Sequence, residues 1–170
     1  SVLLEDGSLA IAKFPHSSDR WDVMAWEATA LDLLEYAGIR TPLRRLTHVG
    51  ERSMLILRRF DRTEAGSRIG YISAMTALGA ADGDHRDYAD IAEAMRDLSR
   101  SPRADHHELF DRAVANVALG NTDDHLRNHA AFWNGSTLEL TPAYDICPQS
   151  HAGEASPATA LDATFRIATL

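Results

Sequence analysis

The chain has 170 residues, of which 45% are apolar and 25% charged, a composition typical of a globular protein with one domain or two small lobes. Its net charge of −8 disfavours direct binding to DNA or RNA, because no overall positive field attracts nucleic acid. The single Cys147 excludes an internal disulfide, and the sequence contains neither a membrane-spanning apolar run nor a signal-peptide pattern, so we expect a cytoplasmic protein.

The first part of the chain predicts a small antiparallel sheet with one helix packed on it. Asp6-Gly7 between two apolar runs is a strong signal for a β-hairpin. The helix has an apolar stripe at helical spacing, and Ser18 or Asp19 is expected to cap it. The predicted elements are strands over 2–4, 9–14, 43–49 and 53–57, and a helix over 20–37.

Lys13 stands out among the basic residues. The chain has 16 Arg and this one Lys, and Lys13 ends a strand face that it shares with Ile11. Glu27 lies beside the apolar stripe of the predicted helix, so it is a candidate partner for a buried cation such as Lys13. On pattern alone, an exposed Lys at the end of a strand and a solvated Glu are the more ordinary interpretations.

The second part of the chain is predicted to be mainly helical. Apolar residues recur at helical spacing in two long segments, and a hairpin follows them with a type I′ turn at Asn134-Gly135. The predicted elements are helices over 69–78, 88–98 and 105–119, and strands over 130–133 and 137–140. We expect two lobes, residues 1–60 forming a sheet lobe and residues 61–170 a helical lobe.

A polar loop over 121–128 separates the last predicted helix from this hairpin. It carries Asp123 and Asn128, and Asp145 follows the hairpin on a second loop. A short hairpin brings its two flanking loops side by side, so the three side chains are expected to converge. Carboxylate and amide oxygens suit Mg²⁺, and a further carboxylate can orient an attacking hydroxyl, as phosphoryl transfer requires.

A zinc or two-metal hydrolase site is the alternative for this loop. His125, His129 and His151 lie near Asp123 and Asp124 in sequence, and such side chains can bind Zn²⁺. However, the chain has no HExxH pattern, and His residues four apart converge only on a helix. We therefore expect His129 to be a structural hydrogen-bonding residue and Asp124 to be solvated.

Several motifs together resemble HipA-like serine/threonine kinases, the toxins of bacterial toxin–antitoxin modules. The resemblance rests on Asn121-Thr122-Asp123-x-His125-x-x-Asn128 and Thr141-Pro142-x-Tyr144-Asp145-Ile146. It is supported by Ala12-Lys13-Phe14-Pro15, by Asp19-Arg20-Trp21-Asp22-Val23 and by Arg59-Phe60-Asp61-Arg62. The resemblance implies an α+β, protein-kinase-like fold with two lobes, and ATP- and Mg²⁺-dependent phosphoryl transfer to a Ser or Thr hydroxyl of a protein.

The resemblance also implies a role for each matching residue. Asp123 would be the catalytic base, and Asn128 and Asp145 would bind Mg²⁺. Lys13 would hold the ATP phosphates with Glu27 as its partner, and Asp61 would lie near the ribose. The remaining nucleotide contacts would come from the hinge residues Arg58, Arg59 and Phe60, and from His125, Arg127 and Tyr144.

Compared with this family, the chain is expected to be truncated at both ends, without the phosphate-covering loop and the final helices. We therefore expect this chain alone to be weakly active or inactive. A small-molecule phosphotransferase of related fold and a non-catalytic nucleotide-binding module remain alternatives. A DNA-binding antitoxin is an expected partner of the family.

Overall fold

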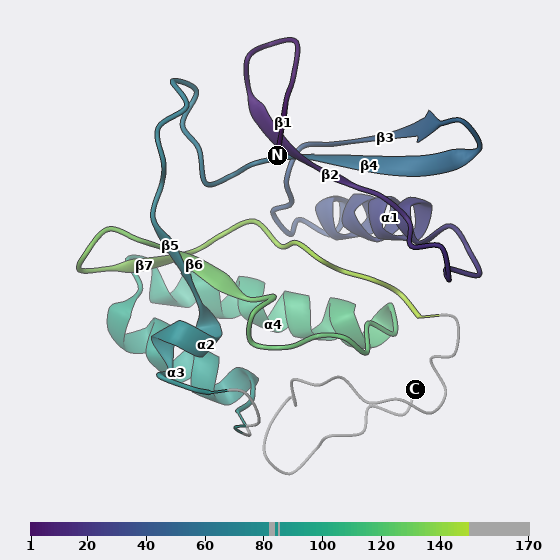
Figure 1. Ribbon diagram of the computed structural model, residues 1–170. Helices are drawn as coiled ribbons and strands as arrows, with labels where there is room; N and C mark the ends of the chain where they lie inside the picture. Colours follow the sequence, from purple (N-terminus) through teal and green to yellow (C-terminus); the bar gives the residue numbers. More distant parts are fainter. Residues whose placement is uncertain (82–83, 85, 150–170) are drawn as a thin grey trace.

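Two small antiparallel sheets, each with its own helices, make up residues 1–81, 84 and 86–149, the part of the chain that the computed structural model describes (Figure 1). In the first half, the elements are β1 (Val2–Leu3), β2 (Leu9–Lys13), α1 (Val23–Tyr36), β3 (Arg44–Val49) and β4 (Arg52–Arg58). In the second half, they are β5 (Tyr71–Ser73), α2 (Ala74–Ala77), α3 (Tyr88–Leu98), α4 (Pro102–Ala118), β6 (Ala130–Trp133) and β7 (Leu138–Leu140). In these residues, no helix is long and apolar enough to cross a membrane.

The first sheet has the strand order β1-β2-β4-β3, and α1 packs on one of its faces. Alternation along β4 sends Leu55 and Leu57 into a core that they share with Leu31 and Leu34 of α1. The register of β2 against β4 pairs Lys13 with Leu55. The β2 pairing therefore fixes where the Lys13 side chain leaves the sheet.

The predicted cap of α1, Ser18 or Asp19, is wrong by three or four residues. The helix is capped by Asp22, whose Oδ1 accepts the N–H of Ala25 at 3.0 Å. The Asp19 carboxylate is used one turn earlier, where it accepts the N–H of His16 at 2.7 Å. Asp19 and Asp22 are both residues of the type that caps helices. The hydrogen bond from His16 to Asp19 forms a turn that ends before the helix begins.

The second sheet has the order β5-β6-β7 and packs against α3 and α4. Its core contains Tyr88, Ile91 and Met95 of α3 together with Leu138 and Leu140 of β7. The predicted helix over 88–98 is confirmed as α3, and the one predicted over 105–119 is α4, which begins three residues earlier, at Pro102. Their apolar periodicity reflects this shared core.

Two local predictions in this half are wrong. Residues 69–78 form a short strand and then one helical turn, because Tyr71 pairs with Phe132 of β6 and the N–H of Trp133 donates to the Gly70 carbonyl at 3.0 Å. The β6–β7 connection is not a two-residue type I′ turn, since the register pairs Trp133 with Leu138. Instead, the Asn134 side chain accepts the N–H groups of Ser136 and Thr137, which favours a longer loop.

The segment after β7 returns to the first sheet. Ala143 and Ile146 are buried in the same core as α1 and β4, and the Ala143 N–H donates to the Arg40 carbonyl at 2.7 Å. The segment that carries Asp145 is therefore packed on the N-terminal half. The expected boundary after residue 60 falls between β4 and β5 and remains a prediction.

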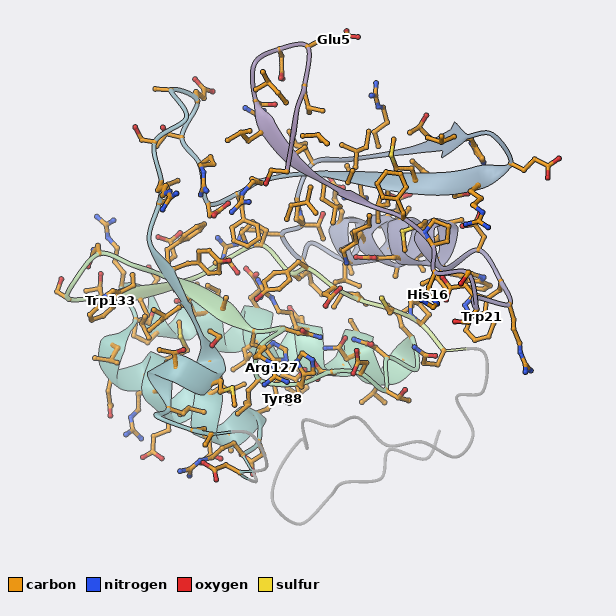
Figure 2. The ribbon with its side chains drawn as sticks, viewed as in Figure 1. Glu5, His16, Trp21, Tyr88, Arg127 and Trp133 are labelled. Carbon is orange, nitrogen blue, oxygen red and sulfur yellow. The ribbon has the colours of Figure 1, made fainter. Side chains whose placement is uncertain are left out.

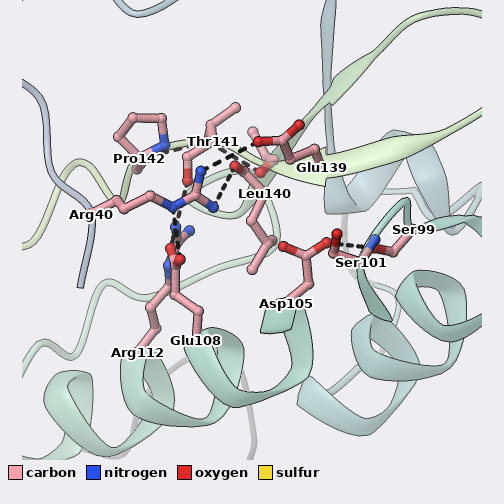
Figure 3. Close-up of polar contacts among 11 residues, drawn as sticks. Arg40, Ser99, Ser101, Asp105, Glu108, Arg112, Glu139, Leu140, Thr141 and Pro142 are labelled. Atoms are coloured by element: carbon pink, nitrogen blue, oxygen red, sulfur yellow. Dashed lines mark hydrogen bonds and ion pairs between the residues drawn. The ribbon is translucent and has the colours of Figure 1, made fainter. Parts of the chain in front are cut away.

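Two arginines, the exposed Arg40 and the buried Arg112, fix the start of this segment (Figure 3). The Arg40 guanidinium donates to Glu108 of α4 at 2.8 Å and to the Leu140 carbonyl at 2.9 Å. Arg112, which is 2% exposed, donates to Glu108 and to the Thr141 carbonyl. These bonds tie α4 to the chain four residues before Asp145.

Candidate active site

The centre of the site is a three-residue ion-pair cluster. The Lys13 ammonium lies 2.7 Å from Oε1 of Glu27 and 2.6 Å from Oδ1 of Asp145. Glu27 is completely buried, so the expectation of a solvated helical Glu does not hold. The alternative interpretation, that Glu27 partners Lys13, agrees with this geometry.

Electrostatics within the cluster favour a charged lysine. Burial disfavours the ammonium, but the charges of Glu27 and Asp145 outweigh it and raise the pKa of Lys13 above its ordinary value. Burial also raises the pKa of Glu27, against the opposing pull of Lys13. Lys13 is therefore held as a charged ammonium between two carboxylates, one of which, Glu27, is completely buried.

Asp145 has an unusual backbone conformation. Its φ of 61° makes it the one non-glycine residue with positive φ in the described ranges. This left-handed conformation costs about 1 kcal/mol or more for a residue with a Cβ atom. The tight packing of Ala143 and Ile146 on either side holds the chain in this conformation and directs the Asp145 carboxylate at Lys13.

A cavity of about 220 Å³ opens beside this cluster, and Ile11, Lys13, Phe60, Asp61, Tyr144 and Asp145 are among its lining residues. Ile11 and Lys13 thus reach one pocket, as their shared strand face predicts. The Phe60 ring packs against Tyr71 and Tyr144, each with a centroid separation of 5.6 Å. The pocket is therefore lined both by packed aromatic rings and by a cation.

The predicted hinge residues line the same pocket but already make internal contacts. The N–H groups of Arg58 and Arg59 donate to the carbonyls of Leu43 and Leu9. The Arg59 and Arg62 side chains both donate to the carboxylate of Asp61, and the hydrogen bonds from Arg59 are the main reason that the pKa of Asp61 is lowered. Asp61 is therefore a constrained, charged carboxylate at the pocket edge.

The polar loop over 121–128 lies beside the Asp145 segment. The Tyr144 hydroxyl donates to the Arg127 carbonyl at 2.7 Å, and the Gln149 N–H donates to the Gly120 carbonyl at 3.3 Å. Within the loop, Nδ2 of Asn128 donates to the Asp123 carbonyl at 3.0 Å. The predicted approach of the two loops is present, and the Asp123 side chain is exposed.

The prediction that Asp124 is solvated is wrong. Asp124 is completely buried, and it accepts hydrogen bonds from the Tyr88 hydroxyl at 2.7 Å and from Nε2 of His129 at 2.8 Å. His129 makes the structural hydrogen bond expected of it. The role of Tyr88 as a hydrogen-bond donor was not predicted from the sequence. The apolar pattern of its helix explains why its ring is buried but gives no partner for its hydroxyl.

The residues present fit a magnesium ion better than zinc. Asp145 and Asn128 offer the carboxylate and amide oxygens that Mg²⁺ prefers. Among the described residues, the one group with three closely spaced potential ligands is Glu27, Asp145 and Cys147. Glu27 in that group is completely buried against Lys13, and burial raises the pKa of the Cys147 thiol to about 12, which disfavours a thiolate ligand.

The zinc alternative finds no support in the described residues. His129 and Asp124 bind each other, and His125 is not part of any described group of three potential ligands. His151 lies outside the described residues.

Comparison with known proteins shows which family and which protein this chain resembles. The chain matches the family described as HipA-like C-terminal domain over residues 2–168. It is 25% identical over 168 residues to the protein named "Putative kinase Y4mE" of Sinorhizobium fredii, covering 92% of this chain and 38% of that protein.

Two solved structures share the fold. HipA of Shewanella oneidensis MR-1, solved as a toxin–antitoxin complex with HipB and operator DNA, has a TM-score of 0.74 at 23% identity, covering 90% of this chain and 41% of that chain. The Helicobacter pylori proinflammatory kinase CtkA has a TM-score of 0.68 at 14% identity, covering 91% of this chain and 64% of that chain.

The chain spans about two fifths of the length of the Y4mE and HipA relatives. The predicted α+β, protein-kinase-like fold is confirmed by the two structural neighbours. With the family match extending over almost the whole chain, this protein belongs to the HipA-like C-terminal domain family.

Proposed function

We propose that the protein transfers the γ-phosphoryl group of ATP, with Mg²⁺, to a Ser or Thr hydroxyl of a protein substrate. The observation that carries this proposal is the position of Lys13, which is paired with Glu27 and Asp145 and lines a pocket that aromatic rings also line. A cation beside a carboxylate and an aromatic pocket fits a nucleotide, whose phosphates need positive charge and whose base needs a flat apolar surface.

In this proposal, the phosphates of ATP bind at Lys13, and the base lies toward Ile11 and Phe60. Asp145 and Asn128 are the proposed Mg²⁺ ligands. A bound metal ion would neutralise charge on the phosphate oxygens. Glu27, which is buried and has no access to ligand, keeps Lys13 in place.

Asp123 is the proposed catalytic base. It is the exposed carboxylate on the loop beside the Asp145 segment, so an acceptor hydroxyl can approach it from solvent. Its role is to orient that hydroxyl and to accept its proton during transfer. His125 and Arg127, on the same loop, are proposed to contact the nucleotide from this side, with Tyr144.

The proposed partners follow from the relatives. The Shewanella HipA structure contains HipB and operator DNA, so we propose a protein partner of the antitoxin type for this protein. The net charge of −8 favours contact with DNA through such a partner over direct contact.

The test is transfer of radiolabelled γ-phosphate by the full-length gene product, with autophosphorylation and added acceptor proteins as readouts. Wild type should label Ser or Thr in a Mg²⁺-dependent way, and Asp123→Asn should lose at least about 10²-fold in rate. Asp111→Asn, an exposed carboxylate of α4, is the control and should retain activity. Labelling of small-molecule alcohols without any protein labelling would establish the small-molecule phosphotransferase instead.

A further inference from the structure

The buried side of the loop over 121–128 contains a polar hub that the proposed transfer chemistry does not use. The hub consists of five side chains joined by hydrogen bonds: Tyr88, Asn116, Asn121, Asp124 and His129. Four of them are at most 3% exposed, and Tyr88 is 7% exposed. Figure 2 labels Tyr88, from α3, and Arg127, from the loop itself.

Asp124 is the centre of the hub. Its two carboxylate oxygens accept from different parts of the chain, Oδ2 from the Tyr88 hydroxyl of α3 and Oδ1 from Nε2 of His129, the residue before β6. The rings of Tyr88 and His129 also pack edge to face, with centroids 5.0 Å apart. A buried carboxylate with directed donors on both oxygens holds its own backbone in one position, because any shift leaves a buried charge unpaired.

The hub also holds the start of the loop. Nδ2 of Asn116 donates to the Tyr88 hydroxyl at 3.0 Å, and Nδ2 of Asn121 donates to Oδ1 of Asn116 at 2.9 Å. The N–H of Asn121 donates to the Asn116 carbonyl as well. The loop is thus anchored at its first residue, in its middle and immediately after its last residue.

Asp123 and Asp124 are neighbours with opposite environments. Asp124 is completely buried while Asp123 is exposed, and the Asp123 carbonyl accepts from Nδ2 of Asn128. The hydrogen bonds that hold Asp124 therefore also fix the direction of its neighbour Asp123. Through the Asp123 carbonyl, they fix the side-chain amide of Asn128 as well. These are the two side chains of the loop to which the proposed function assigns acceptor and metal chemistry.

We propose that Asp124, with Tyr88 and His129, is a positioning device that aims Asp123 and Asn128 at the reacting groups. This inference rests on the proposed function for its kinetic consequence, but its structural part stands without it. A loop that loses the hub stays attached to the folded protein and loses the alignment of Asp123. Small misplacements of this kind cost about 10²-fold in rate.

The kinetic test uses the full-length gene product and Tyr88→Phe, which removes one hydroxyl and keeps the ring. We expect kcat to fall about 10- to 100-fold, while KM for ATP stays within about twofold of wild type. Tyr36→Phe, at a 93% exposed tyrosine of α1, is the matched control and should leave both constants unchanged.

Conservative variants separate positioning from general damage. Asp124→Asn keeps an acceptor for Tyr88 and should retain more kcat than Asp124→Ala, and His129→Gln keeps a donor near the place of Nε2 and should exceed His129→Ala. In the Asp124→Ala background, Tyr88→Phe should lower kcat by less than it does in the wild-type background, because Asp124→Ala has already removed the bond between the two groups. Additive losses, or a Tyr88→Phe protein with wild-type kcat, would overturn the proposal.

A second readout does not depend on catalysis. The Asn128 N–H donates to the His125 carbonyl at 2.8 Å, so its hydrogen exchange reports the order of the loop. Tyr88→Phe should accelerate this exchange at least about tenfold, with no change at Leu55 in the centre of the first sheet. Unchanged exchange would refute the hub's role even in an active enzyme, whereas an inactive wild type with accelerated exchange in the variant would refute only the proposed function.

Discussion

The Lys13 ammonium lies 2.6 Å from the Asp145 carboxylate, although the two residues are 132 positions apart in the chain. Lys13 comes from the β2 strand of the first sheet, and Asp145 follows β7 of the second. The contact forms because Ala143 and Ile146 are buried in the core of the first half. A single charge at the proposed phosphate position thus depends on the packing of both halves of the chain.

Glu27→Gln tests whether the buried carboxylate braces Lys13. The change keeps the shape of the side chain and removes its charge, so Lys13 keeps only Asp145 as a charged partner. We expect the affinity for Mg²⁺·ATP to fall about 5- to 20-fold, the loss of one charge-assisted hydrogen bond. Glu35→Gln, at an exposed position of the same helix, should bind as wild type, and equal affinity in both variants would contradict the bracing role.

Cys147 should be an unusually slow thiol. Burial, followed by the charges of Glu27 and Asp145, raises its pKa to about 12, so little thiolate exists near neutral pH. At pH 8, alkylation in the folded protein should be about 10³-fold slower than in urea-unfolded protein, whose thiol has an ordinary pKa. Because Cys147 is the only cysteine, a thiol-reactive dye measures it directly.

The pH dependence of this reaction gives a second check. Below the raised pKa, each pH unit should speed labelling of the folded protein about tenfold, and the increase should continue beyond pH 9. In unfolded protein, the rate should level off near pH 9. A folded-state rate within tenfold of the unfolded rate at pH 8 would show that Cys147 is not buried beside these carboxylates.

Arg112→Ala should destabilise the protein by about 2–4 kcal/mol, measured by urea unfolding. The residue is buried, and its loss leaves the Thr141 carbonyl without this donor and opens a cavity. Arg112→Met should cost less, because Nε and Nη1 of Arg112 have no hydrogen-bond partner among the described residues and a methionine fills the space without buried donors. Arg103→Ala, exposed on the same helix, should change stability by less than about 0.5 kcal/mol.

The elements that the sequence predicted best are those whose own pattern matches their packing. Apolar periodicity along α3 describes a real core face, and the strand predicted over 53–57 lies in β4, whose Leu55 and Leu57 are in the core. Residues 69–78 fail because their pattern is too short to decide between helix and strand, and pairing of Tyr71 with Phe132 decides it. That partner lies 61 positions away in the sequence, so no local signal contains it.

For the candidate site, too, some predictions from the sequence agree with the structure and one does not. The pattern made Lys13 and Glu27 candidate partners, and the hairpin length brought the Asp123 and Asp145 loops together. The prediction that Asp124 is solvated failed, because nothing in the sequence distinguishes a buried polar residue of a polar loop from an exposed one. Two donors, Tyr88 of α3 and His129 just before β6, make that burial possible. Only the folded chain shows these two residues as its partners.

The most direct test of the account is Mg²⁺·ATP binding to the full-length gene product by calorimetry, for wild type, Lys13→Met and Asp145→Asn. Wild type should bind ATP, and Mg²⁺ should strengthen that binding. Lys13→Met should lower the affinity at least about tenfold, and Asp145→Asn should abolish the effect of Mg²⁺. If wild type shows no Mg²⁺-dependent binding, or if both variants bind as wild type does, then Lys13 and Asp145 do not form a nucleotide site.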